Sequence, residues 1–444
     1  MLHIGIDDTD SIYGKCTTHL AFRITEYILQ KTHANFVDYP LLIRLNPNIP
    51  WKTRGNGAVC LRIRSNNRDQ HRIIDFVKNH VESTSAIGSG ANPGIAFLRG
   101  NFLPAALLEF SRCAMFDVIS KQDAIRLAEK TGVEYSMFGS GRGLVGALAS
   151  VGCLLDSDHT YEAIAYRRPE YCGIPRIIDP KKVIQFSKQT FPYTFNNYDF
   201  DNHRMLIAPH GPDPVFCGIR GEDANVVAYS LRSLKIEEKP AGCMIYRSNQ
   251  GTNMHLQNTI KLSDPKSCTS GYVRCKVSVN PHTTQGGHTF FTVEKDGYIF
   301  QIAVYEPTGL SHLASFLAPG DTIEVGGGIR KPTSNYPKVL NLEYLLVFDL
   351  ASVVNTHNPL CKHCLKRMKS EGKSKGFQCM KCKFKEPASV RKEIVKLQRK
   401  ISPGIYIPTP KAHRHLTKPL QRYGLEKTSL TSLVKCPSFV TFQY

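Results

Sequence analysis

The sequence predicts a multidomain protein in which α/β segments are followed by an antiparallel barrel and a C-terminal zinc ribbon. Three observations support this fold class. Strand-like and helix-like runs alternate through the first half of the 444-residue chain. Five strand-like runs then follow one another, with one short helical run between the third and the fourth. Two C-x-x-C pairs lie in a strongly basic last fifth. The length itself indicates about two to four domains.

The front of the chain, residues 1–105, has the alternation of strands and helices that is typical of a mixed α/β domain. The apolar residues Leu20, Ile24 and Ile28 recur every four positions, which is the spacing of one helix face. The predicted strands are residues 2–6, 41–45 and 58–64, and the predicted helices are residues 19–31 and 69–82.

A second α/β segment is predicted over residues 106–235. It opens with a helical region and then passes through a glycine-rich turn. The predicted elements are strands at 134–138, 159–167 and 204–208, the turn at 139–146 and a helix at 222–233. Residues 235–266 show no clear period, and we expect them to include a connection.

From residue 268 to residue 352 the pattern becomes that of a small β domain. Five strand-like runs are separated by turn residues, and residues 310–317 form the short helical run after the third. This is the order of elements in an OB-fold barrel, which binds single-stranded nucleic acid through a basic groove and stacked aromatics. A small β-sandwich is the alternative.

The composition excludes several classes of protein. Hydrophobic residues make up 41% of the chain, which is too many for a disordered protein. No apolar run approaches the roughly 20 residues of a membrane span, and the N-terminus lacks the basic and apolar regions of a signal peptide. Most of the fourteen cysteines are scattered singly, as expected for reduced thiols in the cytoplasm.

Positive charge is concentrated in residues 356–444, the predicted zinc ribbon and basic C-terminal region. From Cys361 to the end of the chain there are 20 Lys and Arg against four Asp and Glu, so this part carries +16 of the net +20. Such a distribution favours a region that binds a polyanion, above all a nucleic acid. A basic tail that serves only solubility is the alternative.

The four cysteines of C-K-H-C and C-M-K-C are the strongest single motif. Cys361, Cys364, Cys379 and Cys382 form two C-x-x-C pairs separated by 14 residues, a spacing that can place four thiolates around Zn²⁺. Four sulfur ligands leave no open position, so the zinc is expected to be structural. Two disulfides or free thiols are the alternative.

Three carboxylates crowd the end of the first predicted strand. Asp7, Asp8 and Asp10 can hold Mg²⁺, which prefers hard oxygen ligands and bridges nucleotide phosphates. If the strand continued, Asp8 and Asp10 would share a face. Thr17 or Thr18 would then begin a helix, where backbone N–H groups attract phosphate. A plain turn and a helix-capping Thr17 are the alternatives.

Two glycine-rich stretches could approach phosphates closely. The first, G-S-G-A-N-P-G, contains Gly88, Gly90 and Gly94, and an ordinary surface turn is equally consistent with it. The second, G-R-G-L-V-G, contains Gly141 and Gly143 and fits G-x-G-x-x-G. Its following helix is short, which argues against a dinucleotide-binding Rossmann unit.

Longer strings resemble one known family, the archaeal tRNA 2-agmatinylcytidine synthetases, or TiaS family. The strings are G-I-D-D-T-D-S and G-K-C-T-T near the start, G-S-G-R-G-L-V-G-A-L-A (139–149), T-Y-E-A-I-A-Y-R (160–167), F-N-N-Y-D (195–199) and I-A-P-H-G-P-D-P-V-F-C-G-I-R-G-E (207–222). The barrel-like region and the four-cysteine motif follow in that family's order, so the resemblance covers nearly the whole chain.

The resemblance implies a ligase that forms a carbon–nitrogen bond. Family members join agmatine to carbon 2 of the wobble cytidine in the CAU anticodon of an isoleucine tRNA, consume ATP to AMP, and so allow AUA to be read. A phosphorylated cytidine is the implied intermediate. The implied architecture is a kinase-like α/β domain, a ferredoxin-like α+β domain, an OB-fold and a zinc ribbon. The implied cofactors are ATP, Mg²⁺ and structural Zn²⁺.

The resemblance also assigns roles to residues. Asp7, Asp8 and Asp10 match the family's acidic signature, and Thr18 matches the threonine that becomes phosphorylated. Thr17 is the competing assignment from the residues alone, and Lys15 is a further candidate to meet a phosphate.

Agmatine is a dication, so its pocket should carry carboxylates. The candidates in or beside the matching strings are Glu162, Asp199, Asp201, Asp213 and Glu222. A non-catalytic RNA-binding protein, built on the OB-fold and the zinc ribbon, is the alternative to the enzyme.

Overall fold

The computed structural model describes residues 1–429, apart from 54, 235 and 335, and residues 439–441. It divides into two compact units. The first contains residues 1–273, 325–344 and 407–444, and the second contains residues 274–324 and 345–406. We call residues 407–429 the C-terminal segment. It follows the cysteine motif in the chain, yet it belongs to the first unit.

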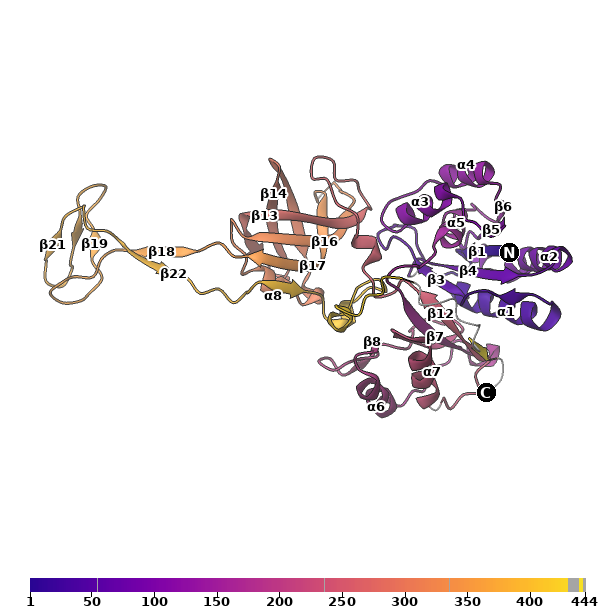
Figure 1. Cartoon of the computed structure of the whole chain (residues 1–444). Coiled ribbons are helices and arrows are strands. Elements are labelled where there is room, and N and C mark those ends of the chain that lie inside the picture. Colours follow the sequence, from indigo (N-terminus) through magenta and orange to yellow (C-terminus); the bar gives the residue numbers. More distant parts are fainter. Residues whose placement is uncertain (54, 235, 335, 430–438, 442–444) are drawn as a thin grey trace. The chain divides into compact units, whose positions relative to one another are not determined.

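The first unit is built on one sheet of eleven strands in the described residues (Figure 1). Its main path runs β6-β5-β1-β4-β3-β12-β7-β11-β8. The strands are β1 (Leu2–Asp7), β2 (Asn35–Phe36), β3 (Leu41–Arg44), β4 (Gly57–Arg64), β5 (Gly94–Arg99), β6 (Glu134–Met137), β7 (Thr160–Tyr166), β8 (Thr194–Phe195), β11 (Val215–Gly221), β12 (Gly242–Ser248) and β24 (Val440–Thr441). Strands of both predicted α/β segments therefore share one sheet.

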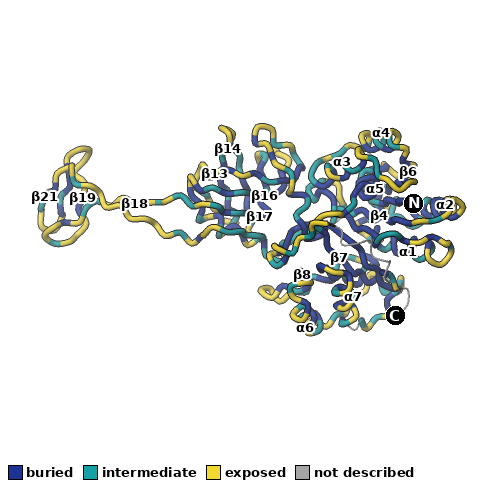
Figure 2. The backbone as a smooth tube through the Cα atoms, in the orientation of Figure 1, coloured by how far each residue is buried: buried dark blue, intermediate teal, exposed yellow. Residues whose placement is uncertain are grey.

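Helices cover both faces of this sheet. The bounds are α1 (Thr17–Lys31), α2 (Asn67–Thr84), α3 (Ala105–Ala114), α4 (Lys121–Thr131), α5 (Leu144–Gly152), α6 (Pro180–Thr190) and α7 (Ala224–Ser233). Because side chains alternate along a strand, Val59 and Leu61 pack with α1 and α2, whereas Ala58 and Cys60 pack with α3, α4 and α5. Figure 2 shows β4 as dark blue, buried backbone.

The predicted strands and helices of the front are confirmed with small changes at their ends. One expectation for the second segment is wrong. Only Arg204–Met205 of the predicted strand 204–208 is a strand, β10, which pairs with β9 (Tyr198–Asp199). The apolar Leu206, Ile207 and Ala208 line a cavity instead. Residues 235–266, expected to include a connection, also contain the central strand β12 (Gly242–Ser248).

Strand β12 joins the two halves of the sheet. It runs parallel to β3 and antiparallel to β7. All seven of its residues are buried, including Arg247, which binds Asp38 and the carbonyl of Leu155. A strand covered on both faces has no polar alternation, which explains why the sequence pattern did not reveal it.

The predicted five-stranded barrel is confirmed. Its strands are β13 (Ser270–Thr283), β14 (Thr289–Lys295), β15 (Tyr298–Val304), β16 (Thr322–Arg330) and β17 (Val339–Asp349). Pairing of β15 with β17 closes the sheet, and the short helix α8 (Ser311–Ala314) lies between the third and fourth strands. Strand β23 (Gly404–Tyr406) adds to β17.

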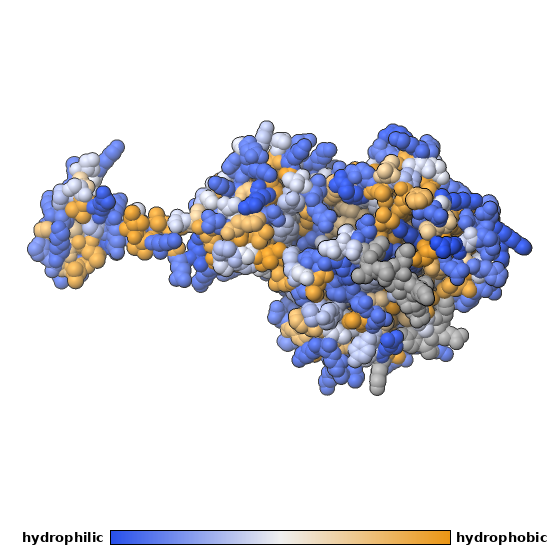
Figure 3. Space-filling view, in the orientation of Figure 1, coloured by the Kyte–Doolittle hydropathy of each residue, from blue (hydrophilic) through white to orange (hydrophobic). Residues whose placement is uncertain are grey.

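The cysteine motif lies in a small β domain that follows the barrel in the chain. Strands β18 (Val354–His357) and β22 (Glu393–Lys396) form an antiparallel ladder, and β19 (Lys369–Ser370), β20 (Phe377–Gln378) and β21 (Lys385–Glu386) form a three-stranded sheet. Exposed apolar residues on the ladder, among them Val354 and Ile394, give the orange patch beside this domain in Figure 3.

Candidate active site

A cavity of about 910 Å³ in the first unit brings together the acidic end of β1 and carboxylates from the β7–β11 half of the sheet. Its walls come from the loop after β1, the start of α1, the end of β3, the start of α5, strands β7 and β11, and the C-terminal segment. The catalytic candidates Asp7, Asp8, Asp10, Thr17 and Thr18 all line it. So do Glu162 and Asp213 among the agmatine candidates.

The acidic cluster lies in a loop and not on a continuing strand. Strand β1 ends at Asp7, and Asp8 has a positive φ of 57°. The strand alternation that would place Asp8 and Asp10 on one face therefore does not apply. After Asp10 the chain makes a tight turn in which Ser11 and Gly14 exchange two backbone hydrogen bonds.

The carboxylates of this loop are close enough to affect one another. Burial, followed by the neighbouring Asp8 carboxylate, raises the pKa of Asp7 well above its ordinary value. Arg142, at the turn before α5, donates from Nε to Asp8 Oδ2 at 2.7 Å. Among the described residues, the side chains whose metal-ligand atoms lie within 4.8 Å of one another are the four cysteines of the ribbon. Binding of Mg²⁺ by this acidic loop therefore stays a prediction.

Helix α1 begins at the threonines. Cys16 is the residue that precedes the helix, so Thr17 is its first residue and not its cap. The Thr17 hydroxyl accepts a hydrogen bond from Thr9 Oγ1 at 3.0 Å, and Thr18 Oγ1 lies 3.1 Å from Cys16 Sγ. Both threonines are nearly buried and line the cavity. Lys15 has a positive φ of 67° and is not among the described lining residues.

The glycines of the two glycine-rich stretches differ in their surroundings: some allow a close backbone approach, and others face open space. A Cβ on Gly94 would lie 2.0 Å from the backbone nitrogen of Leu144, so this glycine allows α5 to approach β5. Gly143 lines the cavity, whereas Gly141 has a positive φ of 69° in the turn before it. Gly88 and Gly90 lie away from the described cavity walls, with nothing within 4 Å of a Cβ. Their phosphate-binding roles stay predictions.

Glu162 on β7 is held by several donors. Arg220 on β11 donates from Nε to Glu162 Oε1 at 3.1 Å, and Gln250 donates to Oε2. Arg44 at the end of β3 lies 3.9 Å from Oε2. Asp213 lies 3.4 Å from an Arg176 nitrogen and accepts from the backbone of Val215 at 3.0 Å.

The other three agmatine candidates lie outside the described walls of the cavity. Asp199 is buried and accepts backbone hydrogen bonds from Asp201 and Asn202, each at 3.1 Å, so it shapes its own loop. Asp201 is exposed. Glu222 binds Arg422 of the C-terminal segment. The assignment of these three to agmatine stays a prediction.

Sequence reasoning missed the basic residues of the cavity. Arg142 lies inside the G-R-G string, but the motif drew attention to its glycines. Arg44 and Arg220 end or lie within strands and carry no motif. His415 lies about 200 residues after the other lining residues, so only the folded chain brings it to the cavity.

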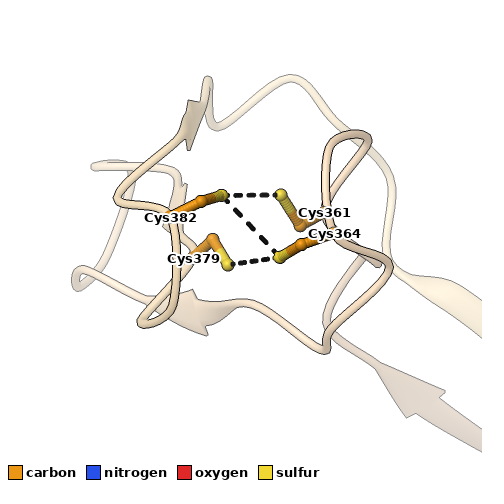
Figure 4. Close-up of side chains that lie close together, drawn as sticks. All are labelled: Cys361, Cys364, Cys379 and Cys382. Carbon is orange, nitrogen blue, oxygen red and sulfur yellow. Dashed lines mark hydrogen bonds between the residues drawn. The ribbon is translucent and has the colours of Figure 1, made fainter.

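The four-cysteine site has the geometry of a tetrahedral metal centre (Figure 4). The Sγ atoms of Cys361 and Cys382 are 3.3 Å apart, as are those of Cys364 and Cys379, and all four lie within 4.8 Å of one another. A disulfide needs about 2.05 Å. Four sulfurs at about 2.3 Å from Zn²⁺ are separated by about 3.8 Å, so the site fits zinc and the disulfide alternative is wrong.

The local backbone supports these thiolates. In each C-x-x-C pair the residue after the second cysteine, Leu365 or Lys383, has a positive φ and donates its N–H to the carbonyl of the first cysteine at 2.9 Å. The backbone N–H of Cys382 lowers the pKa of Cys379 to about 6, which favours the metal-binding thiolate.

Comparison with known proteins connects these two sites. Sequence models of three domains match the chain: the TiaS TCKD domain over residues 3–139, the TiaS FLD domain over 141–255 and the TiaS C-terminal zinc ribbon domain over 358–401. The isoleucine-tRNA 2-agmatinylcytidine synthetase TiaS of Cenarchaeum symbiosum (strain A) is 42% identical over 425 residues, which cover 95% of this chain and 93% of that protein. The chain belongs to the TiaS family.

Other TiaS proteins agree along the full length. That of Methanosarcina mazei is 38% identical over 94% of this chain and 97% of its own. The crystal structure of a TiaS complex with its isoleucine tRNA and ATP superposes with a TM-score of 0.85 at 34% identity, covering 95% of this chain and 97% of that one. A TiaS complex with the same tRNA, AMPCPP and agmatine gives a TM-score of 0.82 at 32% identity, with the same coverage.

Membership of the TiaS family confirms the family that the sequence strings resemble. The match to the TiaS zinc ribbon domain also confirms the predicted ribbon. Among the described residues, no helix is both long and apolar enough to cross a membrane.

Proposed function

We propose that this TiaS family member is an isoleucine-tRNA 2-agmatinylcytidine synthetase. It joins agmatine to carbon 2 of the wobble cytidine of a CAU-anticodon isoleucine tRNA and converts ATP to AMP. The observation that carries the proposal is the single cavity in which an acidic loop, Thr18 and two further carboxylates meet. The full-length likeness to TiaS proteins named for this activity, and to TiaS structures with tRNA, ATP and agmatine, supports it.

The chemistry requires the oxygen at carbon 2 of cytosine to become a better leaving group. Transfer of one phosphoryl group from ATP to that oxygen achieves this, and the second phosphoryl group that ATP loses in becoming AMP would pass by way of Thr18 to water and leave as phosphate. The primary amine of agmatine then attacks carbon 2, the new carbon–nitrogen bond forms, and phosphate leaves with the oxygen. The target base must leave the anticodon stack to reach a cavity of this kind.

Residues around the acidic loop would serve the phosphoryl transfer. Asp8 and Asp10, with Asp7, would hold Mg²⁺, which neutralises charge on the transferred phosphate. Thr18 is the proposed phosphate acceptor, and Thr17, whose hydroxyl already accepts from Thr9, is the second choice. Lys15 remains a proposed phosphate contact.

Two of the five carboxylate candidates are favoured as agmatine contacts. Glu162 and Asp213 line the cavity, and an ionised carboxylate there can accept hydrogen bonds from an ammonium or a guanidinium group. The dication of agmatine would also offset their negative charge.

The proposed domains follow from the same family. We propose a kinase-like domain over 1–105, a ferredoxin-like domain over 106–235, an OB-fold over 268–352 and the zinc ribbon with the basic region over 356–444. The barrel and the ribbon would hold the tRNA while the base is presented to the cavity. Because the substrate is tRNA, we place the protein in the cytoplasm.

The test is incorporation of labelled agmatine into an unmodified CAU isoleucine tRNA in the presence of ATP. We expect label in this tRNA and none in a methionine tRNA with the same anticodon. Asp8→Ala should abolish ATP turnover and leave tRNA binding intact. The proposal fails if folded wild-type protein transfers no label.

A further inference from the structure

A second cavity, of about 500 Å³, adjoins the catalytic one and is lined almost entirely by basic and neutral residues. Its cations are Arg44, Lys52, Arg220, Lys411 and Arg414. Arg44, Lys52 and Arg220 also line the catalytic cavity, so the two share a wall. In the described part of the chain, no carboxylate lines the second cavity.

The Arg44 guanidinium is the least satisfied of these cations. Its side chain is only 14% exposed, and its Nε is buried without a hydrogen-bond partner among the described residues. The nearest carboxylate oxygen, on Glu162, is 3.9 Å away, too far for a hydrogen bond. A nearly buried guanidinium with five N–H donors requires acceptors, and an anion in the cavity would supply them.

Two of the five cations are paired with carboxylates that lie outside the described lining of this cavity: Arg220 with Glu162 and Arg414 with Glu343, each at 3.1 Å. The positive charge still acts on neighbouring groups. Burial, and then Arg414, lowers the pKa of Lys52. Burial, and then Arg44 and Arg220, lowers the pKa of His415 well below its usual value, so this imidazole is neutral and adds no charge. The cations therefore repel one another across a shared space, and a bound anion would relieve that repulsion.

The C-terminal segment builds one wall of this cavity. Residues 410, 411 and 413–416 line it. Two backbone hydrogen bonds of 2.8 Å, from Gly251 to His415 and from Asn253 to Leu416, fix them to the body of the first unit. Lys411 is exposed, and its ammonium group donates to Asn202 Oδ1 at 3.3 Å. Its ammonium group can therefore turn towards a ligand without breaking the fold.

We propose that this basic cavity binds a backbone phosphate of the RNA substrate, next to the nucleotide that enters the catalytic cavity. The inference rests on the proposed function and adds a subsite to it. A nucleoside triphosphate is the other source of phosphate, but its metal ion needs carboxylate ligands, and those lie in the neighbouring cavity. A phosphodiester needs only cations and hydrogen-bond donors, which this lining provides.

The test measures affinity for the unmodified CAU isoleucine tRNA, without ATP or agmatine, over a range of salt concentrations. Lys411→Gln should weaken binding about threefold to tenfold and reduce the slope of log affinity against log salt by about one. Lys52→Gln should do the same, and Lys411→Arg should restore both values. Lys188→Gln, an exposed lysine at the end of α6, is the matched control and should change neither.

The outcomes separate this subsite from the proposed function. If the wild type binds tRNA tightly and Lys411→Gln has the same salt slope as the wild type, the subsite is overturned and the proposed function is not. A raised KM for ATP in Lys411→Gln, with unchanged tRNA affinity, would overturn it in favour of the nucleotide. No agmatine transfer by the wild type would overturn the proposed function, whatever the binding data show.

Discussion

Replacing Arg422 by alanine should detach the C-terminal segment from the body of the first unit. The Arg422 side chain is fully buried and donates to Glu222, Asp158 and the carbonyl of Gly251. Loss of the arginine leaves two carboxylates without their main cation. Removing one partner of a buried ion pair costs about 3–5 kcal/mol. At about 1.4 kcal/mol per tenfold change, the open form of residues 407–429 should become about 100-fold to several thousand-fold more populated.

Amide hydrogen exchange at Gly251 and Asn253 measures this opening directly, because both N–H groups donate to carbonyls of the C-terminal segment. Exchange there should accelerate by the same factor in Arg422→Ala. Arg112→Ala is the control: Arg112 lies 2.6 Å from the exposed Glu109 carboxylate, and such a surface pair contributes about 0–1 kcal/mol. Unchanged exchange in Arg422→Ala would refute the reasoning.

The same assay decides the role of Glu222. If this carboxylate mainly fastens the C-terminal segment, Glu222→Gln should speed exchange at Gly251 and leave the KM for agmatine unchanged. A raised KM for agmatine with unchanged exchange would place Glu222 in the agmatine site after all.

Three further predictions concern other parts of the molecule. Cys379→Ser with Cys382→Ser should release zinc, measured with a chromogenic chelator, and weaken tRNA binding; unchanged affinity would mean that the ribbon does not hold the tRNA. Gly146→Ala places a Cβ 1.9 Å from Asp7 Oδ2, so kcat should fall about 100-fold while tRNA affinity stays constant. Burial lowers the pKa of His3 to about 4, so the unfolded state takes up the proton first as the pH falls below 6.5, and stability drops. Between pH 7 and 5 this histidine should lower the free energy of unfolding by about 2 kcal/mol. Denaturant melts at the two pH values should show that His3→Gln lacks this part of the pH dependence.

The parts of the fold with a one-sided pattern could be predicted from the sequence. Helix α1 shows its buried face as Leu20, Ile24 and Ile28, and the barrel strands alternate. Strand β12 could not be predicted, because both of its faces are covered and a buried Arg247 interrupts its apolar run. The apolar run at 204–208 was misleading because three of its residues form a cavity wall.

The residues of the candidate site could also be predicted only in part. Local strings reveal the acidic loop and the threonines, because their spacing is short and their chemistry is distinctive. Arg44, Arg220 and His415 come from distant points in the chain and meet only through the sheet order and the return of the C-terminal segment. A charge count cannot separate the exposed lysines of the ribbon from Arg422, whose charge is used inside the first unit.

The ribbon precedes the C-terminal segment in the chain, yet the C-terminal segment lines the cavity and the ribbon holds the metal site. The way the chain enters and leaves the ribbon explains how both are possible. The chain leaves the barrel at the end of β17 and returns as β23, which pairs antiparallel with β17. Arg399 fastens this return by donating to Asp321 and to the carbonyl of Ala351, each at 2.8 Å. The ribbon is therefore an insertion whose two ends are tied together. Residues 407–429 begin after this tie, so the wall of the basic cavity is fastened independently of the metal-binding insertion.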